Sequence, residues 1–311
     1  MGDYSVRVIE KIIVLFIAMI AGYIAKKGKL ISGESTKSLS SLLVYITNPC
    51  LIVCSLQREY DSNLLITAAN VFALSVAVHS LLAIFSHFIF RHVKNKSERS
   101  VYSYGLTYSN CGYMGFPLMM AIFKDDPQLG LFYGVIFVTA FNLFSWTHGI
   151  IVMSNEGKIP WKKLVLNPAL IAVIISMVLF LGRIMLPKTI NDGLTLVGDM
   201  TFPLSMIIIG SLLADMNLLK ILSQKKLYLF SALTLLAVPA IMLIIAKLLG
   251  LPEYLSIVGI TMCAAPVAAN TAVTAEVYDN DSALAARLVG ITTLFCLVTM
   301  PFMLWLAEII L

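Results

Sequence analysis

The chain has 311 residues, 59% of them hydrophobic and 13% charged, and its formal net charge is +5 at pH 7. Soluble domains carry about 25% charged residues, so this composition excludes a soluble globular protein and indicates an integral membrane protein. The basic residues flank apolar stretches and form no basic patch interleaved with aromatic residues, so no nucleic-acid partner is expected.

Apolar runs separated by charged or turn residues predict ten membrane spans, each near the roughly 20 residues that a bilayer requires. We predict the spans at 6–25, 36–57, 64–90, 100–123, 129–153, 164–186, 194–215, 226–249, 254–277 and 284–310. The first is read as a membrane helix and not as a signal peptide. Lys26 and Lys27 follow it, where a cleavage site would have small residues.

The distribution of Lys and Arg predicts the orientation. Loops after the odd-numbered spans hold fifteen of the 22 basic residues: Lys26, Lys27, Lys29, Lys37, Arg91, Lys94, Lys96, Arg99, Lys158, Lys162, Lys163, Lys220, Lys225, Lys226 and Arg287. Because basic loops stay in the cytoplasm, both termini are predicted to lie outside it, in a multi-pass protein of the plasma (inner) membrane.

Two spans contain residues that interrupt helices. The fourth holds the run Tyr108-Ser109-Asn110-Cys111-Gly112-Tyr113-Met114-Gly115-Phe116-Pro117, and the ninth holds Cys263-Ala264-Ala265-Pro266-Val267-Ala268-Ala269-Asn270-Thr271. A proline removes one amide donor and clashes with the carbonyl four residues back. Interrupted segments at corresponding positions of two halves point to a transporter's substrate site. We predict two broken helices that cross near the midplane; the alternative for each is a proline kink in an ordinary helix.

Short similarities between the halves support an internal repeat. Thr47-Asn48-Pro49 resembles Thr201-Phe202-Pro203, and each is followed by an apolar run and Ser-Leu. Repeats of five spans have opposite orientations because five is odd. The predicted fold is an all-α membrane protein built as a 5+5 inverted repeat, with halves at 1–155 and 156–311.

Residues at and beside the breaks are predicted to bind the substrate: Asn110, Cys111, Gly112, Gly115, Pro117, Pro266, Asn270, Thr271, Asn142 and Trp146. A half-helix that restarts at a break presents the positive end of its dipole, which favours an anion by up to about 2 kcal/mol. The two asparagines at the breaks add donors for a carboxylate. The alternative for the glycines and for the fifth-span residues is ordinary helix packing. No cofactor or metal site is expected, since the five cysteines form no metal-ligand pattern.

Ionisable residues inside spans cost about 2.5–3.5 kcal/mol at a helix centre on insertion scales, so each is a candidate for ion coupling. These candidates are Asp199, Glu276 and His79. A solvated or salt-bridged role is the alternative for Glu276, and a hydrogen-bonded structural role is the alternative for His79.

Several motifs resemble the auxin efflux carrier family over essentially the whole chain. They are Asn110 with Met114-Gly115-Phe116-Pro117-Leu118, Pro266 with Ala275, Glu276 and Tyr278, Met300-Pro301, Asn167-Pro168, Asp199 and Asn48-Pro49. The resemblance implies ten spans similar to those of bile acid symporters, with a scaffold domain from spans 1, 2, 6 and 7. Spans 3–5 and 8–10 would form a transport domain that carries organic anions by an elevator motion. The resemblance places the substrate at Asn110 and around Pro117, Pro266 and Asn270.

The chain departs from the plant members of that family. Thr271 stands about where they have a further proline, Phe141 lies near their span-five glutamine, and their long central hydrophilic loop is absent. Bacterial members of the family are usually labelled malonate or malate permeases. The resemblance therefore implies a small carboxylate of that kind as the substrate, with auxin-like acids as the other class.

The function predicted from the sequence is secondary transport of a small organic anion by alternating access. A proton, sodium or the membrane potential could drive it, and a homodimer is expected. The alternatives are a sodium-coupled symporter of the bile-acid type, a non-transporting receptor and an intramembrane enzyme. The enzyme would need a catalytic motif such as Gly-x-Ser-x-Gly or His-Glu-x-x-His, and neither occurs.

Overall fold

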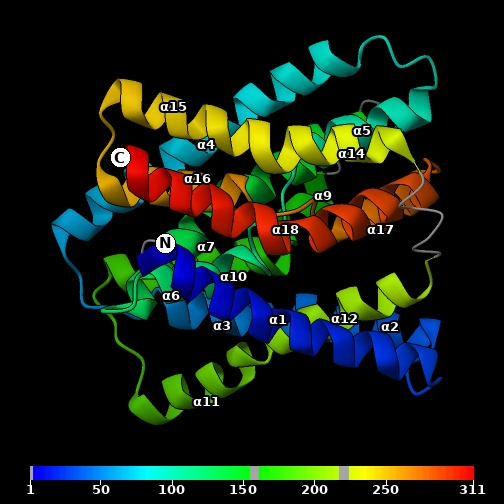
Figure 1. Cartoon of the computed structure of the whole chain (residues 1–311). Coiled ribbons are helices and arrows are strands. Elements are labelled where there is room, and N and C mark those ends of the chain that lie inside the picture. Colours follow the sequence, from blue (N-terminus) through cyan, green and yellow to red (C-terminus); the bar gives the residue numbers. More distant parts are fainter. Residues whose placement is uncertain (1–2, 155–160, 217–223) are drawn as a thin grey trace.

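The computed structural model describes residues 3–154, 161–216 and 224–311, and the regular structure in these residues is helical apart from one β-bridge. The helices are α1 (Asp3–Lys27), α2 (Gly33–Leu42), α3 (Asn48–Ser55), α4 (Ser62–Phe90), α5 (Lys96–Thr107), α6 (Gly115–Ile122), α7 (Pro127–Phe144), α8 (Ile150–Met153), α9 (Trp161–Val165), α10 (Pro168–Leu181), α11 (Lys188–Asp199), α12 (Thr201–Ala214), α14 (Lys225–Ala232), α15 (Val238–Leu249), α16 (Glu253–Cys263), α17 (Asn270–Val277) and α18 (Ser282–Ile310). Figure 1 shows most of them running lengthwise beside one another.

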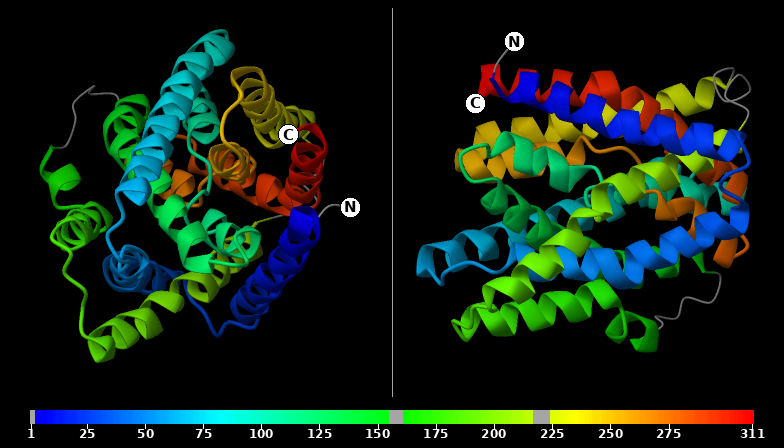
Figure 2. Two further views of the ribbon diagram at one scale, coloured as in Figure 1. Left: turned by 90° about the vertical axis from the view of Figure 1, so that its left-hand side faces the viewer. Right: turned by 90° about the horizontal axis from the view of Figure 1, so that it is seen from below.

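In the described residues, seven helical stretches are long and apolar enough to cross a membrane. They are Val6–Lys27, Gly33–Ser55, Ser62–Phe90, Pro127–Met153, Lys188–Ala214, Lys225–Leu249 and Ser282–Ile310. Two shorter apolar helices are Pro168–Leu181 and Glu253–Cys263. The first and last helices run side by side, and both chain ends lie at the same end of the bundle (Figures 1 and 2). The backbone amide of Tyr4 donates to the carboxylate of Glu308 there.

Three π-helical turns interrupt otherwise continuous helices: η1 (Leu43–Thr47), η2 (Ser145–Gly149) and η3 (Leu233–Ala237). Pro49 follows η1 and Pro239 follows η3. A proline cannot donate to the helix ladder, so the turn before it widens in both places. The second π-turn, η2, contains no proline.

Two helices differ in length from the predicted spans. The span predicted at 164–186 contains α10, which begins at Pro168 because Asn167 caps it: the Asn167 side chain accepts hydrogen bonds from the amides of Ala169 and Leu170. It ends at Leu181, before Arg183, whose φ of 55° is left-handed. The span predicted at 194–215 begins earlier, at Lys188. Its first turns are polar, so hydropathy alone missed them.

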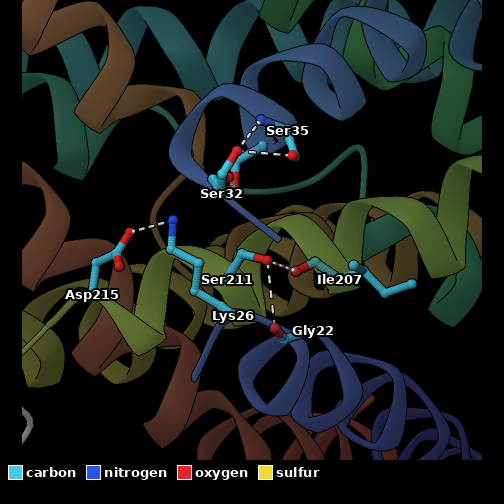
Figure 3. Close-up of polar contacts among 8 residues, drawn as sticks. Gly22, Lys26, Ser32, Ser35, Ile207, Ser211 and Asp215 are labelled. Carbon is cyan, nitrogen blue, oxygen red and sulfur yellow. Dashed lines mark hydrogen bonds and ion pairs between the residues drawn. The ribbon is translucent and has the colours of Figure 1, made fainter. Parts of the chain in front are cut away.

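The interface between α1 and α12 is very close because glycines line it. A Cβ atom on Gly210 would lie 1.9 Å from the Met19 carbonyl oxygen, and one on Gly22 would lie 2.2 Å from that of Ile207. Small residues let membrane helices approach in this way. Ser211 Oγ donates to the Ile207 carbonyl at 2.9 Å, and Lys26 Nζ lies 3.1 Å from the Asp215 carboxylate (Figure 3).

Packing divides the helices into two groups. The α1 group comprises α1, α2, α3, α10, α11 and α12, which are linked to one another by helix packing, and α1 also packs on α6 and α18 of the second group. The α4 group comprises α4 to α8 and α14 to α18. These names are kept below, because the cavity described next lies between the groups.

Candidate functional site

The chain leaves the helical conformation at two places inside the α4 group. Residues 108–114 separate α5 from α6, and residues 264–269 separate α16 from α17. Pro117 is the third residue of α6, where its missing amide costs no helical hydrogen bond. Pro266 lies within the second non-helical stretch.

The two non-helical stretches pair with each other. The amide of Asn110 donates to the Pro266 carbonyl at 2.6 Å, and the amide of Ala268 donates to the Tyr108 carbonyl at 3.0 Å. These bonds form an antiparallel bridge between Ser109 and Val267. Buried backbone groups need partners, and here each interruption supplies the partners of the other.

Side chains complete this crossing. Ser109 Oγ donates to the Met262 carbonyl at 2.9 Å, and the amide of Val267 donates to Thr292 Oγ1 on α18 at 3.1 Å. Both Val267 and Thr292 are fully buried. The crossing is therefore held by hydrogen bonds from α16 and α18 as well as by its own backbone.

A cavity of about 350 Å³ lies against the crossing. The α4 group contributes most of its wall: Ser109, Asn110, Gly112, Tyr113, Phe116, Val138, Phe141, Asn142, Trp146, Ile150, Ala268, Ala269, Asn270, Val273, Thr274, Val277 and Tyr278. The α1 group contributes Val44, Asn48 and Ala169, together with the α10 cap Asn167. The lining described here includes five asparagines and no Lys, Arg, Asp or Glu side chain.

Asn110 is the most informative residue of this wall. Its backbone is fixed at the crossing, its side chain is 4% exposed, and its Nδ2 atom has no hydrogen-bond partner among the described residues. Burying an amide donor without a partner costs about 1–3 kcal/mol. A hydrogen-bond acceptor that reached this atom would remove this cost.

The helices α6 and α17 both begin beside the cavity, at Gly115 and Asn270. The first turn of a helix carries partial positive charge, which favours a negative ligand. The site thus combines amide donors with two helix N-termini, a combination suited to an anion.

A family model described as membrane transport protein matches this chain over residues 7–159 and 157–304. The chain belongs to this family, the auxin efflux carriers. The chain is also 22% identical over 310 residues to an uncharacterized transporter of Methanocaldococcus jannaschii, a match that covers 96% of this chain and 98% of that relative.

The match confirms the predicted family and the predicted class, a multi-pass, all-helical membrane transport protein and not an enzyme.

Five of the ten predicted binding residues line the cavity: Asn110, Gly112, Asn142, Trp146 and Asn270. The other five, Cys111, Gly115, Pro117, Pro266 and Thr271, are not part of the described cavity wall. They surround it instead. Pro266 accepts the hydrogen bond from Asn110, and a Cβ atom on Gly115 would lie 2.7 Å from Met262 Sδ, so that glycine serves close packing. Thr271 is fully buried, and its Oγ1 has no partner in the part of the chain described.

The three predicted coupling residues are not part of the described lining of the cavity, although His79 packs against the lining residue Phe141. Asp199 and Glu276 are exposed, at the end of α11 and on α17. His79 is 2% exposed, and its Nδ1 lies 2.7 Å from the Ser75 carbonyl, to which it donates. Rings of Tyr108, Phe137, Phe141 and Phe144 surround the imidazole. Ion coupling through these residues stays a prediction.

Several cavity residues were not predicted as binding residues, notably Asn48, Asn167, Tyr113, Thr274 and Tyr278. Two of them carried a signal. Asn48 and Asn167 each precede a proline at the start of a helix, which marks a polar residue inside an otherwise apolar stretch. Tyr113 and Tyr278 could not be recognised as binding residues from the sequence, because tyrosines are common in membrane proteins.

Proposed function

We propose that this protein is a secondary transporter that moves a small organic anion across the plasma membrane by an elevator-type alternation of access. The observation that carries the proposal is the pairing of two interrupted helices beside a cavity. The cavity is lined by Asn110, whose side-chain Nδ2 atom is buried without a partner in the described residues. An ordinary bundle of spanning helices has no need of such a crossing.

The proposed topology has ten spans as two inverted repeats, 1–155 and 156–311, with both termini outside the cytoplasm. Seven spans are the long apolar stretches, and α10 is an eighth. The pairs α5–α6 and α16–α17 are the remaining two, each discontinuous at the crossing. In this topology the α1 group serves as the scaffold and the α4 group as the moving transport domain.

The proposed substrate is a carboxylate, malonate-like or malate-like, or an auxin-like acid. The charge of the anion is balanced by partial charges, since the described lining holds amides and helix N-termini but no cation. A hydrogen bond to a charged group contributes about 1.5–3 kcal/mol, and a helix N-terminus contributes up to about 2 kcal/mol. Several such donors together can hold an anion that must also be released.

The position of the cavity fits an elevator motion. Its wall comes from both groups, so a displacement of the α4 group past the α1 group changes the access to the site. The lining runs from the crossing at Asn110 to residues of α17, and Figure 1 shows α17 at the end of the bundle opposite the chain termini. With the proposed orientation, this conformation opens toward the cytoplasm.

The Asn110→Ala variant tests the site. In a thermal-shift screen of short dicarboxylates, aromatic acids and indole acids, the wild type should be stabilised by its substrate. Loss of one charged hydrogen bond should weaken binding by roughly 10-fold to 150-fold. Thr234→Val is the control, because the Thr234 hydroxyl is also buried without a partner in the described structure but lies away from the cavity wall. An unchanged ligand response in Asn110→Ala would refute the assignment.

Transport itself is tested in proteoliposomes with the acid that binds. Uptake under separately imposed pH, sodium and voltage gradients distinguishes a proton-coupled carrier, a sodium-coupled symporter of the bile-acid type and an electrogenic uniporter. Binding without flux under any gradient would favour the receptor alternative. The expected homodimer is a separate prediction, tested by the mass of the detergent-purified protein.

A further inference from the structure

A second hollow lies on the outside of the bundle, between α4 and the η3–α15 segment. Its volume is about 480 Å³ and its wall is almost entirely apolar. The wall includes Ala77, Leu81 and Phe85 of α4 and Val238, Ile241 and Ile245 of α15. The described lining of this groove shares no residue with the cavity at the crossing.

The groove continues into a pocket of different chemistry. This pocket, of about 560 Å³, shares Ile89 and Leu233 with the groove, and its wall includes Lys94, Lys226 and His92. The aromatic rings of Phe90, Tyr102 and Phe230 stack on one another in the same wall. Glu98 is the acidic residue of the described lining, so the two lysines leave the pocket positively charged.

The dimensions of the groove match a membrane. Asn70 and Ile89 are 19 residues apart on α4, a length of about 28 Å at 1.5 Å per residue. The hydrocarbon core of a bilayer is about 30 Å thick, so the groove follows it from one face to the other. The basic pocket then lies at headgroup level, at the end that the distribution of Lys and Arg assigns to the cytoplasm.

We propose that this groove and pocket form a binding site for an anionic phospholipid of the cytoplasmic leaflet. One acyl chain lies along Ala77, Leu81 and Phe85, and the phosphate lies between Lys94 and Lys226. Basic pockets between membrane helices on the cytoplasmic side suit anionic headgroups. The site does not rest on the transport proposal, because its elements are an apolar groove in a membrane protein and a charge at one end of it.

The lysine pair provides the first test, on the full-length protein purified in detergent. Native mass spectrometry with added phosphatidylglycerol or phosphatidylcholine measures the two affinities. Each lysine near an anionic headgroup changes affinity by about 5-fold, so Lys94→Gln with Lys226→Gln should weaken phosphatidylglycerol binding by about 25-fold. Phosphatidylcholine binding should change little. The control is Lys96→Gln with Lys225→Gln, which removes the same charge from exposed residues at the same end that do not line the pocket.

The groove provides the second test. Ala77→Trp fills its middle and should weaken the binding of both lipids, whereas Ile84→Trp, on an exposed part of α4 that does not line the groove, should weaken neither. Glycerol phosphate, a headgroup without chains, should not compete. Equal effects of the two lysine pairs, or full competition by glycerol phosphate, would overturn the proposal. If Ala77→Trp unfolds, the lysine pairs decide by themselves.

Discussion

Thr292 tests the crossing most directly. Its Oγ1 atom accepts the hydrogen bond from the Val267 amide at 3.1 Å and itself donates to the Leu288 carbonyl at 2.7 Å. Replacing Thr292 with valine keeps the branched shape of the side chain and removes only this oxygen. The Val267 amide is then left buried without an acceptor in the middle of the second interruption.

The expected cost follows from burial. Val267 and Thr292 are both 0% exposed, so water cannot replace the lost partner without entering the core. A buried donor without a partner costs about 1–3 kcal/mol. The Thr292→Val variant should therefore lower the free energy of unfolding by about that amount, with little offset from the added methyl group.

The neighbouring residue supplies a matched control. Thr293 is 1% exposed, and its Oγ1 has no hydrogen-bond partner among the described residues. The Thr293→Val variant removes an unsatisfied hydroxyl from an apolar site, so stability should be unchanged or higher, by up to roughly 1 kcal/mol. Two identical substitutions at adjacent positions should therefore have opposite effects.

The measurement is the thermal unfolding of both variants and the wild type in the same detergent, with denaturant unfolding to obtain the free energies. Equal stabilities for Thr292→Val and Thr293→Val would show that the Val267 amide does not depend on Thr292. The crossing would then be held differently from the arrangement described above.

Two further predictions concern packing and charge. Gly210→Ala should destabilise the α1–α12 interface by about 1–3 kcal/mol, because the new Cβ would meet the Met19 carbonyl oxygen at 1.9 Å. Gly193→Ala adds a Cβ that would meet no described atom within 4 Å, so it should stabilise α11 by about 0.5–1 kcal/mol. Thermal unfolding of both variants measures these effects, and equal changes in melting temperature for Gly210→Ala and Gly193→Ala would contradict the packing argument. At the start of α7, the hydrogen bond from Arg58 lowers the pKa of Asp126. The ionised pair should therefore stabilise the folded protein above about pH 4, and this contribution should be lost as the pH falls through the lowered pKa. The Asp126→Asn variant keeps the side-chain cap of α7 and should be less stable than the wild type by up to about 1 kcal/mol at pH 7. A stability difference that persists at about pH 2 would contradict the role of the Arg58–Asp126 pair.

The sequence alone predicted those features of the fold that depend on the residues of a single segment. Apolar runs predicted the long helices, and the residues near Asn110 and Pro266 marked the places where the chain leaves the helix. The family prediction, which the comparison confirms, used the same residues. Proline, glycine and asparagine act on their own backbone, so their effects can be read without knowing the fold.

The cavity wall was harder to predict, because it depends on which helices face each other. Tyr113, which precedes α6, and Tyr278, which follows α17, look like ordinary aromatic residues of membrane spans until the fold brings both to one cavity. Asp199 is a different case. It was predicted as a coupling residue because it is a carboxylate in an apolar span; its side chain is exposed at the end of α11, and its role stays a prediction. Burial is a property of the assembled bundle, and hydropathy cannot supply it.

The hydrogen bonds of the structure suggest which parts would move together. Separating the two non-helical stretches would break the hydrogen bonds from Asn110 to Pro266 and from Ala268 to Tyr108. Each buried backbone group left without a partner would cost about 1–3 kcal/mol. The two interrupted helices are therefore expected to move as one unit with α18. Between the α1 and α4 groups, by contrast, polar contacts gather at the end that holds both chain termini.

These contacts are the Arg58–Asp126 pair, the bond from Arg7 to the Ile122 carbonyl at 3.3 Å, and the bond from the Tyr4 hydroxyl to Glu253 at 2.8 Å. The bond from Tyr4 is exposed and the other two are partly buried. Ion pairs near the surface contribute about 0–1 kcal/mol each, so the Arg58–Asp126 pair can break and re-form during a transport cycle. The cavity lining includes residues of α17, at the other end of the bundle. The proposed elevator motion would leave the costly hydrogen bonds of the crossing intact. It would exchange these polar contacts together with the apolar packing of α1 on α6 and α18, where Val8 and Ile12 are buried in one cluster with Leu118 and Met303, so this packing sets the main cost of the motion.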